Sequence, residues 1–212
     1  KFPFSKKYYQ QDFFVSTNNF SAFKLIDSWP NWPGKWLNIF GESGSGKTHL
    51  SKILEKKIKK TKLIDAKNID RKIIEELNYI DCLIVDGFDK NIDEKLLYSI
   101  FNQSKQLDNY ILINSTNLIQ KFNYELKDLS SRINSFIFIG IELPTDDLLK
   151  VIITKSFSDK QISINPKLAE YIIKNIERSY EKMFKFLKDV DELSLSTGKS
   201  ININLIKKVL NQ

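Results

Sequence analysis

Short apolar runs alternate with longer amphipathic stretches along the first two thirds of the chain. The runs have the length of strands and predict strands at residues 36–40, 61–65, 83–86, 110–114 and 136–139, of which 61–65 is the most polar. Before and between them, the spacing of apolar positions predicts helices at residues 16–29, 49–60, 69–77 and 93–106. Candidate caps of the first helix are Ser16, Thr17 and Asn18. Strands that alternate with helices indicate an α/β fold, in which a five-stranded parallel sheet lies between two helical layers.

The pattern changes after Leu143, where strand signals fade except for a brief one at residues 200–202. Helical spacing continues at residues 145–160, 165–175, 179–195 and 204–210. Two of these stretches have good starts, Thr145 before two aspartates and Asn165 before Pro166. We therefore expect an N-terminal arm over residues 1–15, a sheet domain over 16–143 and a small all-α lid domain over 144–212.

Composition is that of an ordinary soluble globular protein, with 42% hydrophobic and 28% charged residues among 212. No apolar run approaches the ~20 residues that a membrane span needs, and no secretory signal pattern occurs. The single cysteine, Cys82, lies in an apolar run, so a disulfide within the chain is excluded. These features predict a cytoplasmic protein.

The net charge of +7 raises the question of nucleic-acid binding. Thirty of the 33 basic residues are lysine, and the three arginines are Arg71, Arg132 and Arg178. Bidentate contacts with guanine and phosphate favour arginine, and no helix-turn-helix, zinc-finger or aromatic RNA-binding signature occurs. We therefore interpret the lysines as a solvated surface and expect direct DNA binding to be weak or absent.

Residues 41–48 read Gly-Glu-Ser-Gly-Ser-Gly-Lys-Thr, the full pattern of a phosphate-binding P-loop, between a predicted strand and a predicted helix. In such a loop Lys47 reaches the β- and γ-phosphates, Thr48 offers its hydroxyl to Mg²⁺, and the helix directs its positive end at the anion. The candidate nucleotide-binding residues are Gly41, Glu42, Ser43, Gly44, Ser45, Gly46, Lys47, Thr48 and His49. The chain is therefore predicted to bind ATP or ADP with Mg²⁺.

Asp86 ends a hydrophobic run at a suitable distance after the P-loop. A carboxylate there is expected to hold the water shell of Mg²⁺ opposite Thr48. The alternative is an aspartate that merely caps a turn at the end of a strand.

A five-stranded P-loop domain followed by a helical lid resembles the AAA+ ATPases, and among them the DnaA initiator family with its short relatives, the Hda regulators. Gly-Lys-Thr-His-Leu at 46–50 is similar to the initiators' P-loop, and Asp-Leu-Ser-Ser-Arg-Ile at 128–133 resembles the box that carries an arginine finger. Residues 12–15 followed by Asn18 resemble the segment that covers the adenine, which implies nucleotide contacts by Phe14 and Val15. The loop at 29–34 resembles the alphaproteobacterial Hda branch.

Three departures from the family pattern concern hydrolysis. Gly87 follows Asp86 where an active AAA+ ATPase carries a second acid, and Asp89 lies further along the chain. Glu181 occupies the position of the lid's sensor arginine, with Arg178 nearby as a substitute. On the fourth strand the sensor candidates are Thr116 and Asn114. The resemblance thus implies good nucleotide binding, poor hydrolysis of the chain's own ATP and a preference for ADP.

The resemblance also implies an activity in trans, in which Arg132 acts on the ATP of another protein. An Hda-like chain would join the DNA-loaded sliding clamp, stimulate ATP hydrolysis by DnaA and so prevent re-initiation. The initiator's DNA-binding domain has no counterpart before Gln212, so we expect a regulator rather than the initiator itself. The alternative role of Arg132 is an ion pair with Asp128, one turn earlier on a helix.

The N-terminal residues and the identity of the partner each allow more than one interpretation. Lys-Phe-Pro-Phe at 1–4 is either the end of a clamp-binding motif or a segment that packs against the sheet. A helicase loader of the DnaC type would share the fold but act on the replicative helicase and single-stranded DNA. A small P-loop kinase fits poorly, because such a lid is rich in arginine and only Arg178 lies beyond Leu143. A homodimer or an AAA+ oligomer is compatible with this fold.

Overall fold

The computed structural model describes residues 13–159, 162–198 and 201–210. It divides into two compact units, which are described separately below. Of the described residues, the first unit comprises 13–15, 19–41 and 46–141, and the second comprises 16–18, 42–45 and those from 142 to 210. The sequence predicts a single boundary near Leu143, whereas the second unit also takes two short segments from the N-terminal part of the chain.

A five-stranded parallel sheet forms the centre of the first unit, in the order β2-β3-β4-β1-β5. The strands are β1 Trp36–Phe40, β2 Thr61–Asp65, β3 Cys82–Phe88, β4 Tyr110–Ser115 and β5 Ile137–Gly140. This sheet confirms the predicted fold class. Because all strands are parallel, the carboxyl ends of β1, β3 and β4 meet at one edge, where ligands bind in such folds.

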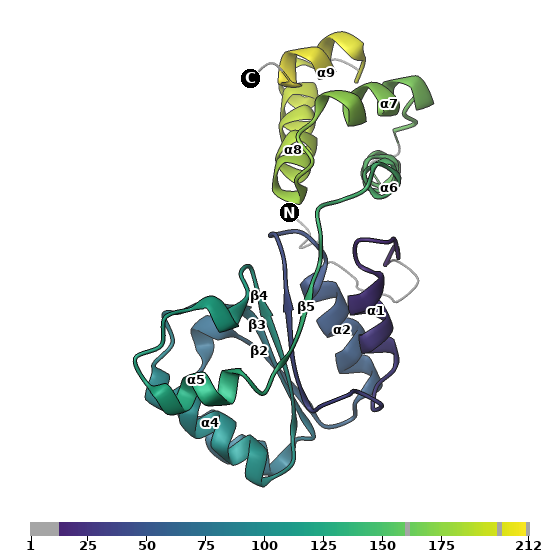
Figure 1. The fold of residues 1–212 in the computed structure, drawn as a ribbon. Coiled ribbons are helices and arrows are strands. Elements are labelled where there is room, and N and C mark those ends of the chain that lie inside the picture. The colour runs from purple at the N-terminus through teal and green to yellow at the C-terminus, as the bar shows by residue number, and fades with distance from the viewer. Residues whose placement is uncertain (1–12, 160–161, 199–200, 211–212) are drawn as a thin grey trace. The chain divides into compact units, whose positions relative to one another are not determined.

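Helices cover both faces of this sheet (Figure 1). Helices α1 (Phe20–Asp27) and α2 (Lys47–Lys57) lie on one face, and α3 (Lys72–Glu76), α4 (Glu94–Gln106) and α5 (Lys127–Ile133) belong to the other. Neighbouring strand residues enter different cores. Ile84 packs with Leu50 and Leu54 of α2, whereas Leu83 packs with Phe101 of α4. Burial on both faces explains why β3 begins with a continuous apolar run rather than an alternating one.

The first helix begins later than predicted, at Phe20 instead of Ser16. The hydroxyl of Ser16 donates to the side chain of Asn18, so these groups satisfy each other instead of capping a helix. Residue Asn19 precedes the helix and forms no side-chain cap; its amide donates to the carbonyl of Phe14 (3.0 Å). The helix predicted at 69–77 is likewise shorter, because α3 gives way to a 3₁₀ turn at Leu77–Tyr79.

Four helices form the second unit and enclose a core of their own. They are α6 Asp146–Ser158, α7 Pro166–Asn175, α8 Tyr180–Thr197 and α9 Ile203–Leu210. Both predicted helix starts are correct: Thr145 accepts from the Leu148 N–H (3.3 Å), and Asn165 caps α7 with Pro166 in first position. The brief strand signal at 200–202 was wrong for its described residues, since 201 and 202 lead directly into α9.

None of the helices in the described ranges has both the length and the apolar character that a membrane span requires.

The buried thiol of Cys82 gives a simple test of the first unit's packing. Its side chain is fully buried at the start of β3, and this burial, with a smaller effect of the Asp81 charge, raises the pKa of the thiol to about 12. Since the thiolate is the reactive form, we expect almost no reaction with DTNB in the native protein at neutral pH. Labelling should reach one thiol per chain in guanidinium chloride, followed by absorbance. Fast labelling of the native chain would contradict this packing.

Candidate nucleotide-binding site

The predicted phosphate-binding loop leaves the end of β1 and enters α2 (Figure 1). Gly46 precedes the helix in a left-handed conformation (φ 97°), which side chains rarely adopt. A Cβ atom at this position would also lie 2.9 Å from the ring of Phe13. Both observations explain why the loop requires glycine at Gly46. The short turn directs the first N–H groups of α2 outward, an arrangement that favours anions.

The two chemically important side chains of the loop already make directed contacts. The Lys47 ammonium donates to the carbonyl of Gly41 (2.7 Å), so it lies back over the loop. The Thr48 hydroxyl donates to Asp86 Oδ2 (2.7 Å). The structure therefore brings the predicted Mg²⁺ residues together from α2 and β3, which are 38 positions apart in the sequence.

A buried amide extends this arrangement towards the fourth strand. Asn114 Nδ2 donates to Asp86 Oδ1 (2.8 Å) and to the hydroxyl of Ser51 (2.7 Å). Asn114 is fully buried, yet no described residue donates to its Oδ1 atom. Buried acceptors are nearly always satisfied by protein or by ordered water, so this atom is suited to accept from a water molecule beside Asp86.

The residues of the first unit fit a nucleotide with Mg²⁺. Oxygen donors are the ligands that Mg²⁺ prefers, and it is usually held by one or two protein groups together with phosphates and waters. Thr48 and Asp86 supply such donors, and Asn114 leaves an acceptor for a water of the shell. When bound, the ion would neutralise negative charge on the phosphate oxygens. Lys47, Thr48 and Asp86 would hold the pair.

The backbone after Asp86 also explains why no second acid is present. Gly87 is in the left-handed region (φ 70°) at an irregularity in the pairing of β3 with β4. The next acid, Asp89, lies beyond the buried Phe88 and accepts from the backbone N–H of Asn91 (2.8 Å). Asp89 is thus engaged in its own turn, and the structure does not bring it to Asp86.

The remaining predicted residues of the first unit are dispersed around the loop. His49 packs edge-on against Phe13, with ring centroids 5.3 Å apart. Phe14 is 42% exposed, and Val15 is partly buried. Thr116 is exposed beyond the end of β4, so of the two sensor candidates only Asn114 contacts Asp86.

The middle of the loop, Glu42–Ser45, groups with the second unit. There the Glu42 carboxylate accepts from the Tyr180 N–H (2.6 Å) and the Ser179 hydroxyl, at the start of α8. Ser45 is buried and its N–H donates to the Glu42 carbonyl (3.1 Å), whereas Ser43 and Gly44 are exposed. Glu42 thus supplies a negative charge at the N-terminus of α8, which favours that helix.

The sensor candidates of the second unit do not carry a free positive charge at α8. Arg178 forms an ion pair with Asp146 (2.9 Å) and is 62% exposed. Lys182 lies 3.8 Å from Glu177, and Glu181 is exposed on the first turn of α8. Burial raises the pKa of the neighbouring Tyr180 to about 12, so this phenol remains neutral at physiological pH.

Arg132 lies on α5, on the sheet face opposite α2, and is partly buried. Its Nε atom donates to Oδ1 of Asn102 on α4 (2.8 Å). Among the described residues Arg132 forms no ion pair, so the alternative contact with Asp128 does not occur there.

Sequence reasoning missed two residues of these sites, Ser51 and Asn102. Ser51 lies one turn after Thr48 on α2, so its spacing gave a signal that was overlooked. Asn102 is 30 positions from Arg132, and no local pattern links the two.

Comparisons with known proteins show similarities in sequence and in fold. Residues 146–210 match the family described as "Hda, lid domain". The chain is 26% identical to the chromosomal replication initiator protein DnaA of Buchnera aphidicola (subspecies Cinara cedri) over 98% of its own length and 53% of that protein. It thus spans about half the length of the curated relatives it matches.

Two solved structures share the fold. The crystal structure of domain III of Thermotoga maritima DnaA superposes with a TM-score of 0.75, at 17% identity, over 95% of this chain and 94% of that one. AMPPCP-bound DnaA from Aquifex aeolicus gives 0.69, at 20% identity, over 92% of this chain and 67% of that one. Together, these matches show that the chain is related in sequence and fold to DnaA, and that residues 146–210 match the lid domain of the Hda family.

Proposed function

We propose that this chain is a nucleotide-binding, Hda-like regulator of replication initiation. Together with the DNA-loaded sliding clamp, it stimulates ATP hydrolysis by DnaA and so prevents re-initiation. Its own P-loop holds ADP or ATP with Mg²⁺ as a structural ligand. Support comes from a lid of the Hda type, from the DnaA relatives and from the two sites described above.

The observation that carries this proposal is the state of Arg132. Its guanidinium is fixed through Nε by a neutral amide, and among the described residues no carboxylate pairs with it. A guanidinium that no carboxylate among the described residues neutralises is suited to charge that develops on a phosphate of another protein. The chain thus has the group that an activator supplies in trans.

The chain's own P-loop site also supports a protein that binds nucleotide but activates hydrolysis on a partner. Lys47, Thr48 and Asp86 are arranged for binding, but Gly87 offers no side chain to orient an attacking water molecule. The chain is therefore proposed to bind nucleotide well and to hydrolyse it slowly. The proposed clamp contact involves residues 1–4, which lie outside the described residues.

Reconstitution tests the proposal. We expect the isolated chain to turn over ATP far more slowly than ~1 s⁻¹, the lower end for kinases, because no second acid accompanies Asp86. When the chain is added to its cognate ATP-loaded DnaA with DNA-loaded clamp, DnaA-bound ATP should be converted to ADP, measured with labelled nucleotide and thin-layer chromatography. Omission of the clamp should weaken the effect.

Two outcomes would contradict this function. A fast rate from the isolated chain would mean that another residue replaces the missing carboxylate. No stimulation of DnaA, together with loading of the replicative helicase onto single-stranded DNA, would assign the chain to the helicase loaders instead.

A further inference from the structure

A surface cavity of about 380 Å³ lies between α4 and α5. The described residues that line it are Asn102, Lys105, Gln106 and Arg132. Two of these side chains are cationic, two are neutral amides, and none is a carboxylate. Such a lining is complementary to an anion with several oxygens, because both cations and both amides can donate hydrogen bonds.

Asn102 fixes the orientation of the guanidinium within this cavity. It accepts from Arg132 Nε (2.8 Å), which leaves the four N–H bonds of the two terminal nitrogens for a ligand. An arginine side chain normally loses rotamer entropy when it binds a ligand, which weakens binding. The contact with Asn102 already orders the side chain and so reduces this entropic cost. Because Asn102 is neutral, it fixes the Arg132 side chain and leaves its positive charge intact. An ion pair with Asp128 would instead neutralise that charge.

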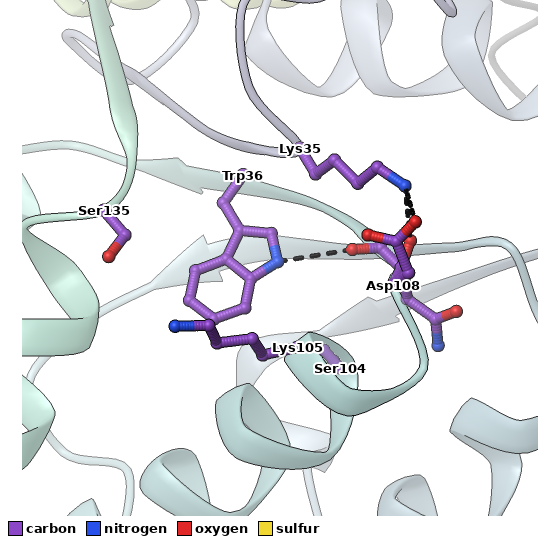
Figure 2. A pocket seen from close by; sticks show the side chains of 7 residues that line it. Lys35, Trp36, Ser104, Lys105, Asp108 and Ser135 are labelled. Carbon is purple, nitrogen blue, oxygen red and sulfur yellow. Dashed lines mark hydrogen bonds and ion pairs between the residues drawn. The ribbon is translucent and has the colours of Figure 1, made fainter.

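Lys105 adds a second positive charge that is also unopposed. It lies one turn after Asn102 on α4, and among the described residues its side chain makes no ion pair or hydrogen bond. Figure 2 draws another pocket, which Lys105 also lines together with Trp36 and Asp108. The Asp108 carboxylate pairs with Lys35 instead. Lys105 therefore keeps its charge available at the cavity.

We infer that this cavity is a two-cation site for the terminal phosphates of the partner's nucleotide. Arg132 contacts the reacting phosphate, Lys105 supplies a second charge to the same phosphate chain, and Asn102 is a positioning residue that acts through Arg132. The inference rests on the proposed function, since it specifies how the activating surface receives ATP bound to another protein. It assigns roles to two residues of α4 for which the sequence gave no signal.

The positioning role is tested by a double-mutant cycle in the reconstituted DnaA assay. Asn102→Ala should lower the maximal stimulated rate about tenfold, because a charge-assisted hydrogen bond that orients Arg132 is lost. The concentration of chain that gives half-maximal stimulation should stay unchanged. Asn102→Ala combined with Arg132→Ala should be no slower than Arg132→Ala alone, and all variants should keep the parent's melting temperature. If Asn102→Ala instead caused a general structural defect, it would lower the stimulated rate by the same factor in the parent and in Arg132→Ala.

The second cation is tested with a matched pair of lysines from the same helix. Lys105→Gln should lower the stimulated rate about tenfold, whereas Lys95→Gln, which removes the same charge from the other end of α4, should leave it unchanged. If both substitutions changed the rate equally, Lys105 would contribute only to the general electrostatic attraction of the surface. Its role as the second cation of the cavity would then be wrong.

The controls separate failure of this inference from failure of the proposed function. A full rate for Asn102→Ala, while Arg132→Ala is inactive, would overturn the positioning role and leave the proposed function intact. A full rate for Arg132→Ala would overturn the proposed function itself, and this site with it.

Discussion

Replacement of Arg132 with alanine should lower the stimulation of DnaA ATP hydrolysis by about 10³-fold or more, the range found for arginine fingers in GTPases. The guanidinium would stabilise charge on the partner's phosphate as the bond to the leaving group breaks. Alanine removes this charge, and the other basic residue of α5, Lys127, lies at the opposite end of that helix. The rate is measured as conversion of DnaA-bound ATP to ADP with clamp-loaded DNA.

Several controls make this result specific. Arg132→Ala should keep the parent's melting temperature and ADP affinity, because Arg132 lies on the other face of the sheet from α2. Arg132→Lys should rescue poorly, since an ammonium lacks both the planar fork and the Nε–H that Asn102 binds. If the alanine variant stimulates DnaA as well as the parent does, the mechanism in trans is wrong.

Replacement of Lys47 with alanine should lower the affinity for ADP by about 100-fold or more. The ammonium now donates to the Gly41 carbonyl, a neutral contact that is readily exchanged for phosphate oxygens. Loss of one strong charge-assisted interaction corresponds to about 3 kcal/mol, and the lysine can make more than one. Titration calorimetry with Mg²⁺–ADP measures the change.

A second lysine of the same helix provides the control for this substitution. Lys52 pairs with Glu55 on α2 (3.0 Å), so Lys52→Ala removes an equal charge one turn further from the loop and should leave ADP affinity unchanged. Circular dichroism should show the parent's helix content for both variants. Undiminished affinity in Lys47→Ala would refute the assignment of the P-loop.

The sheet and its nucleotide loop were predictable from sequence because both have local signals. Strand β3 begins with a continuous apolar run, since residues such as Leu83 and Ile84 are buried in different cores on the two faces of the sheet. The pattern at residues 41–48 is equally local, because the turn itself requires glycine at Gly46. Caps at Thr145 and Asn165 were also correct, since a cap acts within three residues.

What the sequence did not reveal depends on contacts between distant positions. The hydrogen bond between Asn102 and Arg132 joins residues 30 positions apart, and no sequence pattern predicts this contact. Asn114 and Asp86 are 28 positions apart, so only the structure shows which sensor candidate, Asn114 or Thr116, contacts Asp86. The late start of the first helix has a local cause instead, because Ser16 and Asn18 bond to each other, a competition that cap preferences alone do not decide.

The conformation of Gly87 has a consequence for the evolution of this site. An added Cβ would meet no atom within 4 Å, so space is available for an acidic side chain. The backbone is the obstacle, because a left-handed conformation costs most side chains roughly 1–2 kcal/mol. A chain that evolved a glutamate here would pass through a less stable protein, unless β3 first lost its irregular pairing. A second acid at this position therefore requires a change of the backbone as well as of the side chain.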